Sequence, residues 1–453
     1  MLEKQREYFK SGITLDVNFR ITKLKLLKES ILNNLDDLVK AFKEDYKKCK
    51  FDVYSTEIGL VINEINYFIK HLKKLTKKRK VKTSLINIPS NGYIVNEPYG
   101  NVLVVSPWNY PFQLAMIPLI GALATGNTVY LKNSRNVPRV SEVIKKILSV
   151  FDEEYVYVME NTKENIDKLF DLKFDYVFYT GSPAVAKDLM QRQAKHLTPL
   201  TLELGGKSPC IIDKDADIEK SAKRLVWGKY LNAGQTCVAP DYVLVHNDVK
   251  RELVKYILKY INEFYYNEGK LREDFTAIVN ERDLKRLLSL TYKNKIICGG
   301  NVVNGTLEPT VIEEVSFDDE IMNEEIFGPI MPLIEFDNLD DVINYLKTLD
   351  KPLSLYYFGK NKQNQDKVIN NVSFGGGCIN DTIMHLTEEK LPFGGIGLSG
   401  IGSYHGKKSF EIFSHQKSIL KKHPKLEVNL KYPPYNEKKL KLTKFYFRIK
   451  KGR

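Results

Sequence analysis

One cysteine lies in a run of small and polar residues where it could act as a nucleophile. Cys237 is part of NAGQTCVAPDY. Taken alone, a free cysteine is more often a buried structural thiol, because only a minority of cysteines are nucleophiles. The neighbours favour the reactive alternative, since Ala233 and Gly234 leave room for a substrate and backbone amides in such a turn can donate to an oxyanion. The pattern therefore predicts covalent catalysis at Cys237.

Two polar side chains could assist this nucleophile. Glu203 ends an apolar segment and precedes two glycines in TLELGGKSPC, where desolvation would raise its proton affinity, as suits a general base. Asn109 lies in SPWNYP, whose prolines stiffen the loop and could fix its amide as an oxyanion donor. Each has an ordinary alternative, a solvent-exposed glutamate at a strand end and a turn asparagine.

A third segment could bind phosphate. In FYTGSPAVAK, Gly181 and Ser182 follow an apolar strand and precede a helix. Backbone amides and the helix dipole at such a position can hold a pyrophosphate. The segment is not the GxGxxG fingerprint, so a tight turn with a helix cap explains it equally well.

The elements around these residues predict an α/β protein. Apolar residues recur at helical spacing between 19 and 80, and short apolar strands then alternate with helices, as in a doubly wound parallel sheet. A second α/β set follows Leu204. In the segment 86–97 the spacing between apolar residues is shorter than in a helix. The segment also contains Asn91-Gly92, and the two features together predict a β-ribbon with a hairpin turn there. The predicted elements are strands at 101–106, 128–132, 155–160, 176–180, 242–246, 354–358 and 374–380, and helices at 113–125 and 137–151.

Composition limits the class of protein. The chain has 453 residues, 43% hydrophobic and 28% charged, which predicts a globular protein of two or three domains. The formal charge of +13 comes from Lys spread along the whole chain, so we expect no nucleic-acid partner. Five scattered cysteines without CxxC spacing predict reduced thiols and no metal site. The N-terminus lacks the apolar core of a signal peptide and no apolar run reaches the length of a membrane span, so we expect a cytoplasmic protein.

Seven motifs together resemble the aldehyde dehydrogenase superfamily. They are SPWNYP, GNTVYLK, FYTGS, TLELGGK, GQTC, EEIFGP and LPFGG, in the order and approximate spacing of that superfamily. GQTCVAPDYVL, LTPLTLELGGKSPC and LPFGGIGLSGIGSYHGKKSFEIFSH resemble the class 3 branch, which acts on fatty and aromatic aldehydes. The resemblance covers roughly residues 15 to 420.

The resemblance implies a three-part fold and a homodimer. The three parts are a Rossmann-like cofactor-binding domain (1–82 and 98–205), an α/β catalytic domain (206–412) and an oligomerisation β-ribbon with a bridging element (83–97 and 413–430). A basic C-terminal tail (431–453) follows them. In the tail, Lys and Arg interleave with Phe445, Tyr446 and Phe447. Weak peripheral contact with anionic lipid fits this composition, although packing in the dimer or disorder is the preferred interpretation.

The resemblance also implies a role for each motif residue. Cys237 would be the nucleophile, Asn109 and the backbone amide of Cys237 the oxyanion hole, and Glu203 the base that activates the hydrolytic water. Glu325 of EEIFGP would hold the nicotinamide ribose and is a second candidate for the base. The implied cofactor-binding set is Trp108, Lys132, Arg135, Gly181, Ser182, Glu203, Leu204, Glu325 and Phe327.

The implied reaction is the NAD- or NADP-dependent oxidation of an aldehyde to a carboxylic acid through a thiohemiacetal and a thioester on Cys237. The chain departs from the family at LKNSR, where Arg135 replaces the usual acidic residue. Because Arg attracts a 2′-phosphate, we expect NADP to be used at least as well as NAD. Two alternatives are a non-catalytic relative and an acyl-CoA reductase; the intact residue set opposes the first, and Glu203 opposes the second.

Overall fold

The N-terminal segment is helical, as its apolar spacing predicts. The computed structural model describes residues 1–291, 295–303 and 305–449. Asp16 caps the second helix by accepting hydrogen bonds from the backbone N–H groups of Asn18 and Phe19. The elements are α1 (Leu2–Lys10), α2 (Val17–Leu32), α3 (Leu35–Tyr46), α4 (Lys50–Asp52), the π-helical turn η2 (Val53–Ile58) and α5 (Gly59–Leu75). The apolar residues at helical spacing become core, with Leu24, Leu27, Ile31, Leu38 and Phe42 fully buried.

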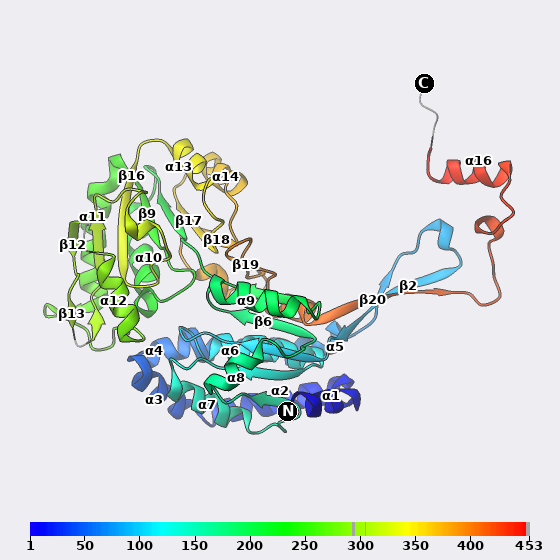
Figure 1. The fold of residues 1–453 in the computed structure, drawn as a ribbon. Coiled ribbons are helices and arrows are strands. Elements are labelled where there is room, and N and C mark those ends of the chain that lie inside the picture. Colours follow the sequence, from blue (N-terminus) through cyan, green and yellow to red (C-terminus); the bar gives the residue numbers. More distant parts are fainter. Residues whose placement is uncertain (292–294, 304, 450–453) are drawn as a thin grey trace. The chain divides into compact units, whose positions relative to one another are not determined.

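The first sheet has the order β19-β7-β6-β3-β4-β5. Figure 1 labels two of its strands, β6 and β19. Its strands are β3 (Asn101–Val105), β4 (Thr128–Lys132), β5 (Val156–Val158), β6 (Tyr176–Thr180), β7 (Leu200–Glu203) and β19 (Gly400–Ile401). All neighbours are parallel except β19, which pairs antiparallel with β7. The accompanying helices are α6 (Gln113–Thr125), α7 (Pro138–Leu148), α8 (Lys163–Leu169) and α9 (Pro183–Ala194).

The second sheet has the order β12-β15-β16-β9-β8-β17-β18 and is parallel except for β12. Its strands are β8 (Pro209–Ile212), β9 (Tyr242–His246), β12 (Lys295–Cys298), β15 (Thr310–Glu313), β16 (Ile330–Phe336), β17 (Ser354–Phe358) and β18 (Gly376–Ile379). Its helices are α10 (Ile218–Tyr230), α11 (Asn247–Tyr265), α12 (Glu281–Ser289), α13 (Leu339–Leu346) and α14 (Lys362–Asn371). Two short strand pairs accompany it, β10 (Tyr266–Asn267) with β11 (Lys270–Leu271), and β13 (Val302–Val303) with β14 (Thr306–Leu307).

The predicted α/β class and most predicted elements are confirmed. The segments 113–125, 128–132, 176–180, 242–246 and 354–358 have the predicted bounds. β3 and β9 are buried at every residue, because helices cover both faces of a parallel sheet and each strand is then apolar throughout. The other strands and α7 are shorter than predicted, since buried residues continue into the adjoining loops.

The chain returns to the first sheet near its end. β19 pairs with β7 so that Gly400 lies opposite Glu203, and α15 (Gly406–Ile412) packs against α6 and α5. Both sheets belong to one compact unit, Met1–Thr76 with Glu97–His415. The predicted division at residue 205 therefore stays a prediction. Within the described part of the chain, no helix combines the length and apolarity needed to cross a bilayer.

A second unit consists of Lys77–Asn96 and the chain from Gln416 onward. It holds most of the three-stranded sheet β1-β2-β20, built from β1 (Arg79–Val81), β2 (Ser90–Pro98) and β20 (Ser414–Lys422), in which β1 and β2 are antiparallel. The tail forms α16 (Glu437–Tyr446), which Asn436 caps by accepting from the N–H of Lys439.

The predicted hairpin turn at Asn91-Gly92 is wrong. Both residues lie within β2, where Gly92 pairs with Val81, and the reversal is made by the segment between β1 and β2, which contains a 3₁₀ turn at Leu85–Asn87. A two-residue Asn-Gly turn requires positive φ at both residues, and neither has it here. The strand pairing overrides the local turn preference.

Candidate active site

The loop that carries Cys237 is held in an uncommon backbone conformation. It follows the 3₁₀ turn η4 (Leu231–Gly234), in which Asn232 and Ala233 have φ of 54° and 53°. Gln235 braces the loop, since its side-chain amide donates to the carbonyl of Asn232 at 3.1 Å and accepts from the N–H of Val279 at 3.0 Å. Gln235 thus ties the loop to the η4 turn at Asn232 and to the chain at Val279. These two bonds fix the backbone just before Cys237.

Asn109 lies beside this loop although it is distant in sequence. Its side-chain amide donates to the carbonyl of Gln235 at 3.2 Å, and its own carbonyl accepts from Asn232 Nδ2 at 3.0 Å and from the Tyr46 hydroxyl at 3.1 Å. An amide nitrogen carries two N–H donors, so this bond uses one of them. The prolines of SPWNYP and these contacts together fix the donor near Cys237.

Glu203 is a buried carboxyl at the end of β7. Its exposed fraction is 2%, and neither carboxyl oxygen has a hydrogen-bond partner among the described residues. Burial raises the pKa of Glu203 well above its usual range, because water no longer solvates the charged form. Burial therefore favours the neutral form of this carboxyl over its charged form.

Glu325 is a second carboxyl, and it lines the same cavity as Glu203. It lies directly against the chain at Gly205, where a Cβ would come within 2.1 Å of Glu325 Oε2. Burial, with a further contribution from Asp241, raises the pKa of Glu325 to about 8. Burial also raises the pKa of the Cys237 thiol, and the two carboxyls, Glu325 and Glu203, raise it further. The thiol therefore needs a base to become a thiolate.

One cavity of about 220 Å³ collects most of the predicted site. It is lined by Pro107, Trp108, Asn109, Leu114, Thr180, Gly181, Ser182, Pro183, Glu203, Leu204, Gly205, Cys237, Glu325 and Phe327. The rings of Trp108 and Phe327 pack edge to face, with their centroids 5.4 Å apart. Ser182 precedes α9 without capping it through its side chain, so the first N–H groups of α9 remain available to a ligand. We call this space the cofactor cavity.

Two predicted residues lie outside the cofactor cavity. Lys132 ends β4, and its carbonyl accepts from the N–H of Ser106, which follows β3. Burial lowers the pKa of Lys132 to about 8, with a smaller contribution from the charge of Arg135. Arg135 is exposed. Both follow the carboxyl end of a strand neighbouring β3, the edge where parallel sheets bind nucleotides.

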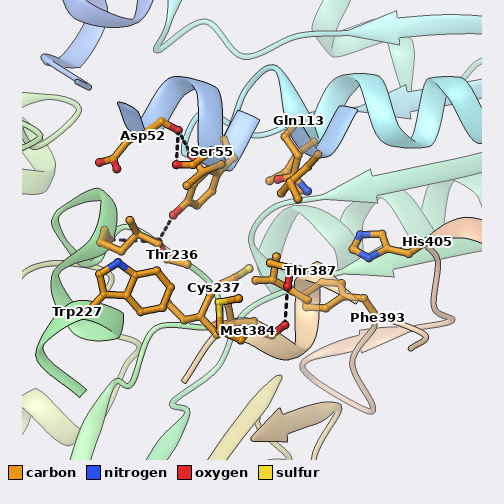
Figure 2. A pocket seen from close by; sticks show the side chains of 18 of the residues that line it. Asp52, Ser55, Gln113, Trp227, Thr236, Cys237, Met384, Thr387, Phe393 and His405 are labelled. Carbon is orange, nitrogen blue, oxygen red and sulfur yellow. Dashed lines mark hydrogen bonds between the residues drawn. The ribbon is translucent and has the colours of Figure 1, made fainter. Parts of the chain in front are cut away.

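A second cavity, of about 370 Å³, was not predicted from the sequence. Figure 2 shows side chains from several segments around Cys237, including Gln113, Trp227, Met384, Phe393 and His405. The full lining is Phe51, Asp52, Ser55, Thr56, Leu60, Tyr110, Gln113, Leu114, Trp227, Leu231, Thr236, Cys237, Val238, Ile383, Met384, Leu386, Thr387, Phe393, Tyr404 and His405. We call it the apolar cavity.

Cys237 and Leu114 line both cavities. A thiol in this position can attack a molecule bound on one side while a second molecule lies on the other side. The cofactor cavity has helix N–H donors near Ser182, a glycine at 181 and two carboxyls in its lining. The fold and this site define an α/β protein with a thiol between two ligand-sized cavities, one of them at the sheet edge where such folds bind nucleotides.

The chain belongs to the aldehyde dehydrogenase family, whose sequence model matches residues 2–419. It is 44% identical to the 4,4'-diaponeurosporen-aldehyde dehydrogenase of Staphylococcus aureus over 98% of this chain and 97% of that one. It is 40% identical to mouse aldehyde dehydrogenase family 3 member A2 over 99% and 94% of the two chains. A solved structure of a substrate-bound state of Staphylococcus aureus AldH superposes with a TM-score of 0.96 at 44% identity, covering 98% of each chain. The class 3 resemblance of the motifs is thereby confirmed.

Proposed function

We propose that this aldehyde dehydrogenase oxidises medium- or long-chain aliphatic or aromatic aldehydes to carboxylic acids, with Cys237 as the nucleophile and NAD or NADP as the oxidant. Family membership gives the reaction, the NAD(P)-dependent oxidation of aldehydes. The observation that carries the assignment to Cys237 is its position in the wall common to the two cavities. The substrate carbonyl and the cofactor can then reach the same residue from opposite sides.

Each residue of the site has a role in this proposal. Cys237 attacks the aldehyde carbon, and the Asn109 amide with the backbone N–H of Cys237 stabilises the oxygen anion of the thiohemiacetal. The nicotinamide, when bound, accepts the hydride. A thioester on Cys237 results, and hydrolysis by a base-activated water releases the acid.

We propose that the cofactor is held in the cofactor cavity and along the end of β4. The buried carboxyl oxygens of Glu203, which have no hydrogen-bond partner among the described residues, support a polar ligand there. Ser182 and the first N–H groups of α9 would hold the pyrophosphate, Glu325 the nicotinamide ribose, and Lys132 the adenosine ribose. Trp108, Leu204 and Phe327 supply the apolar walls. Arg135 would attract a 2′-phosphate, which favours NADP at least equally with NAD.

The base that activates water is Glu203 or Glu325. Both carboxyls line the cofactor cavity with Cys237, and burial raises the pKa of each. A base with a pKa near the working pH is the most effective proton acceptor. The pKa of Glu325, about 8, suits this task, whereas Glu203 is the residue that the hydrolytic family pattern assigns.

The substrate class rests on the apolar cavity. Its walls are mostly aliphatic and aromatic, and its volume of about 370 Å³ lies within the usual range of ligand pockets. Burial of each methylene of an aliphatic chain contributes about 0.8 kcal/mol. We therefore expect kcat/KM to rise with chain length until the cavity is filled.

The direct test combines one substitution with product analysis. Cys237→Ala should abolish aldehyde-dependent cofactor reduction, because no thiohemiacetal can form. Wild-type enzyme should release the free acid without coenzyme A, and an absolute requirement for coenzyme A would instead identify an acyl-CoA reductase. Turnover by Cys237→Ala at the wild-type rate would refute the proposal.

We further propose a cytoplasmic homodimer. A nucleophilic cysteine must stay reduced, and all five cysteines are free thiols in the structure, as expected in a reducing compartment. The sheet β1-β2-β20 ends in β1 and β20, two edge strands whose outer backbone groups can pair with a second copy. Weak contact of the basic tail with anionic lipid is proposed as a separate property of α16 and the residues after it.

A further inference from the structure

A fully buried ion pair contacts two residues of the apolar cavity wall, Tyr110 and Gln113. Lys48 follows α3, and Glu57 lies in η2; their Nζ and Oε1 atoms are 2.9 Å apart, and both side chains have an exposed fraction of 0%. Three aromatic rings surround the ammonium group, with Nζ-to-centroid distances of 5.5 Å to Phe42, 6.0 Å to Tyr46 and 4.1 Å to Tyr110. The roles proposed above do not use this pair.

Stability does not account for such a pair. Removing two charges from water costs several kcal/mol per ion, and a well-packed apolar pair of similar volume is often equally stable or more stable. Charges in a low-dielectric interior do, however, fix the positions of the groups around them. The pair therefore matters through the groups that it contacts and whose positions it fixes.

Glu57 holds the start of the helix behind the site. Its second carboxyl oxygen accepts from the backbone N–H of Gln113, the first residue of α6, at 2.8 Å. That contact fixes the chain four residues after Asn109. Figure 2 shows Gln113 above the pocket that contains Cys237.

Lys48 reaches the nucleophile loop through a tyrosine. Its ammonium lies over the ring of Tyr110, and the Tyr110 hydroxyl is hydrogen-bonded to Thr236 Oγ1 at 2.7 Å. Thr236 directly precedes Cys237, and Tyr110 directly follows Asn109. Tyr110, the residue next to Asn109, thus connects the ion pair to Thr236, the residue next to Cys237.

We infer that Lys48 and Glu57 are positioning residues for the reaction, acting through Tyr110 and Thr236 to set the distance between the Asn109 amide and the Cys237 sulfur. The inference rests on the proposed roles of Cys237 and Asn109. The attacking sulfur and the oxyanion donor come from loops 128 residues apart. The hydrogen bond from Asn109 to Gln235 joins these loops, and the bond between Tyr110 and Thr236 adds a further link directly beside the sulfur. A displacement of about 1 Å can cost about a hundredfold in rate.

The test is a double-mutant cycle on kcat. One arm is the neutral pair Lys48→Met with Glu57→Gln, which removes both charges together and leaves no single buried ion. The other arm is Tyr110→Phe, which keeps the ring and removes only the hydroxyl that bonds to Thr236. We expect each arm to lower kcat about tenfold and the triple variant to lose little more than either arm. KM for the cofactor should stay unchanged.

Two outcomes would overturn the inference. The first is a triple variant whose loss equals the product of the separate losses, because independent sites act additively. The second is Tyr110→Phe with wild-type kcat, which keeps the test decisive even if the neutral pair fails to fold. Lys250→Met is the matched control, since Lys250 forms ion pairs with Glu313 and Glu335 in the second sheet region, away from both cavities. It should lower the melting temperature without changing kcat.

A second readout needs no turnover. The rate at which iodoacetamide alkylates the Cys237-containing peptide, followed by mass spectrometry, reports the environment of the sulfur directly. We expect the neutral pair and Tyr110→Phe to change this rate by a similar factor and Lys250→Met to leave it unchanged. If Cys237→Ala were fully active, the proposed function would fail, whereas the alkylation result would still decide whether the pair positions this loop.

Discussion

At the scale of single residues, the site brings one thiol and two carboxyls into a space that excludes most water. Cys237, Glu203 and Glu325 line one cavity, and burial is the main cause of the raised pKa of all three. Burial thus favours the neutral form of each of these groups, which lessens the repulsion that a negatively charged cofactor would meet on entering the cavity.

The base that hydrolyses the thioester can be identified by pH. Glu325 must be deprotonated to accept a proton, so with its pKa at about 8 the hydrolysis rate should rise about tenfold per pH unit below pH 8 and level off above it. Pre-steady-state bursts separate this step from acylation. If Glu325 is the base, Glu325→Gln should lower hydrolysis about a hundredfold or more and Glu203→Gln should not. The reverse result would assign the base to Glu203, and wild-type hydrolysis in both variants would exclude both.

Cofactor preference can be tested at a single exposed residue. Arg135→Glu replaces a cation that attracts a 2′-phosphate with an anion that repels it. The ratio of kcat/KM for NADP to that for NAD should fall at least about tenfold. Arg282→Glu, an exposed change on α12, should leave the ratio unchanged. A strong preference of the wild type for NAD that Arg135→Glu does not alter would contradict the expectation.

At the scale of elements, the site is assembled where strands and helices end. β7 ends at Glu203, α9 begins after Ser182, and η4 ends three residues before Cys237. Glycines are needed where these ends meet other groups. Gly205 is the clearest case, because Glu325 occupies the space that a Cβ would fill.

Gly205→Ala should therefore displace the Glu325 carboxyl. A Cβ at 2.1 Å from Oε2 requires the side chain to move, since the carboxylate end is the flexible partner. We expect a higher KM for the cofactor, with a change in unfolding free energy of no more than about 3 kcal/mol. Gly269→Ala is a control, because nothing lies within 4 Å of its Cβ position although its φ is +75°. That change should cost only about 1 kcal/mol of stability and leave KM unaltered.

At the scale of the whole molecule, the second unit carries apolar side chains that its own fold leaves exposed. In and after α16 these are Leu440, Leu442, Phe445, Tyr446, Phe447 and Ile449. Lysines alternate with them along the helix. A short basic and apolar helix binds anionic membranes weakly and in a salt-dependent manner.

Flotation with anionic liposomes tests the tail separately from the dimer. Full-length enzyme should float in part at low salt and less at 150 mM salt, because screening shortens the Debye length to about 8 Å. A variant that ends before residue 430 should not float, yet it should sediment as a dimer if the ribbon sheet forms the interface. Loss of the dimer on truncation would assign the tail to subunit packing instead.

The sequence by itself determined the α/β class and most strands of the first sheet, and it supplied the candidates for the reactive groups. Apolar runs such as 128–132 and 176–180 depend only on neighbours a few residues away, and the Cys237, Glu203 and Asn109 motifs are local as well. Asn91-Gly92 shows the limit, because strand pairing with β1 overrode a strong local turn signal.

Only the tertiary structure decided which groups share a space. The apolar cavity combines residues from η2, α6, α10 and the segment after β18, and none of these segments shows a local pattern that indicates a pocket. The bond from Asn109 to Gln235 and the path from Lys48 to Thr236 likewise join distant parts of the chain. Local periodicity reports which face of an element is buried, whereas a cavity is a property of how several faces pack against one another.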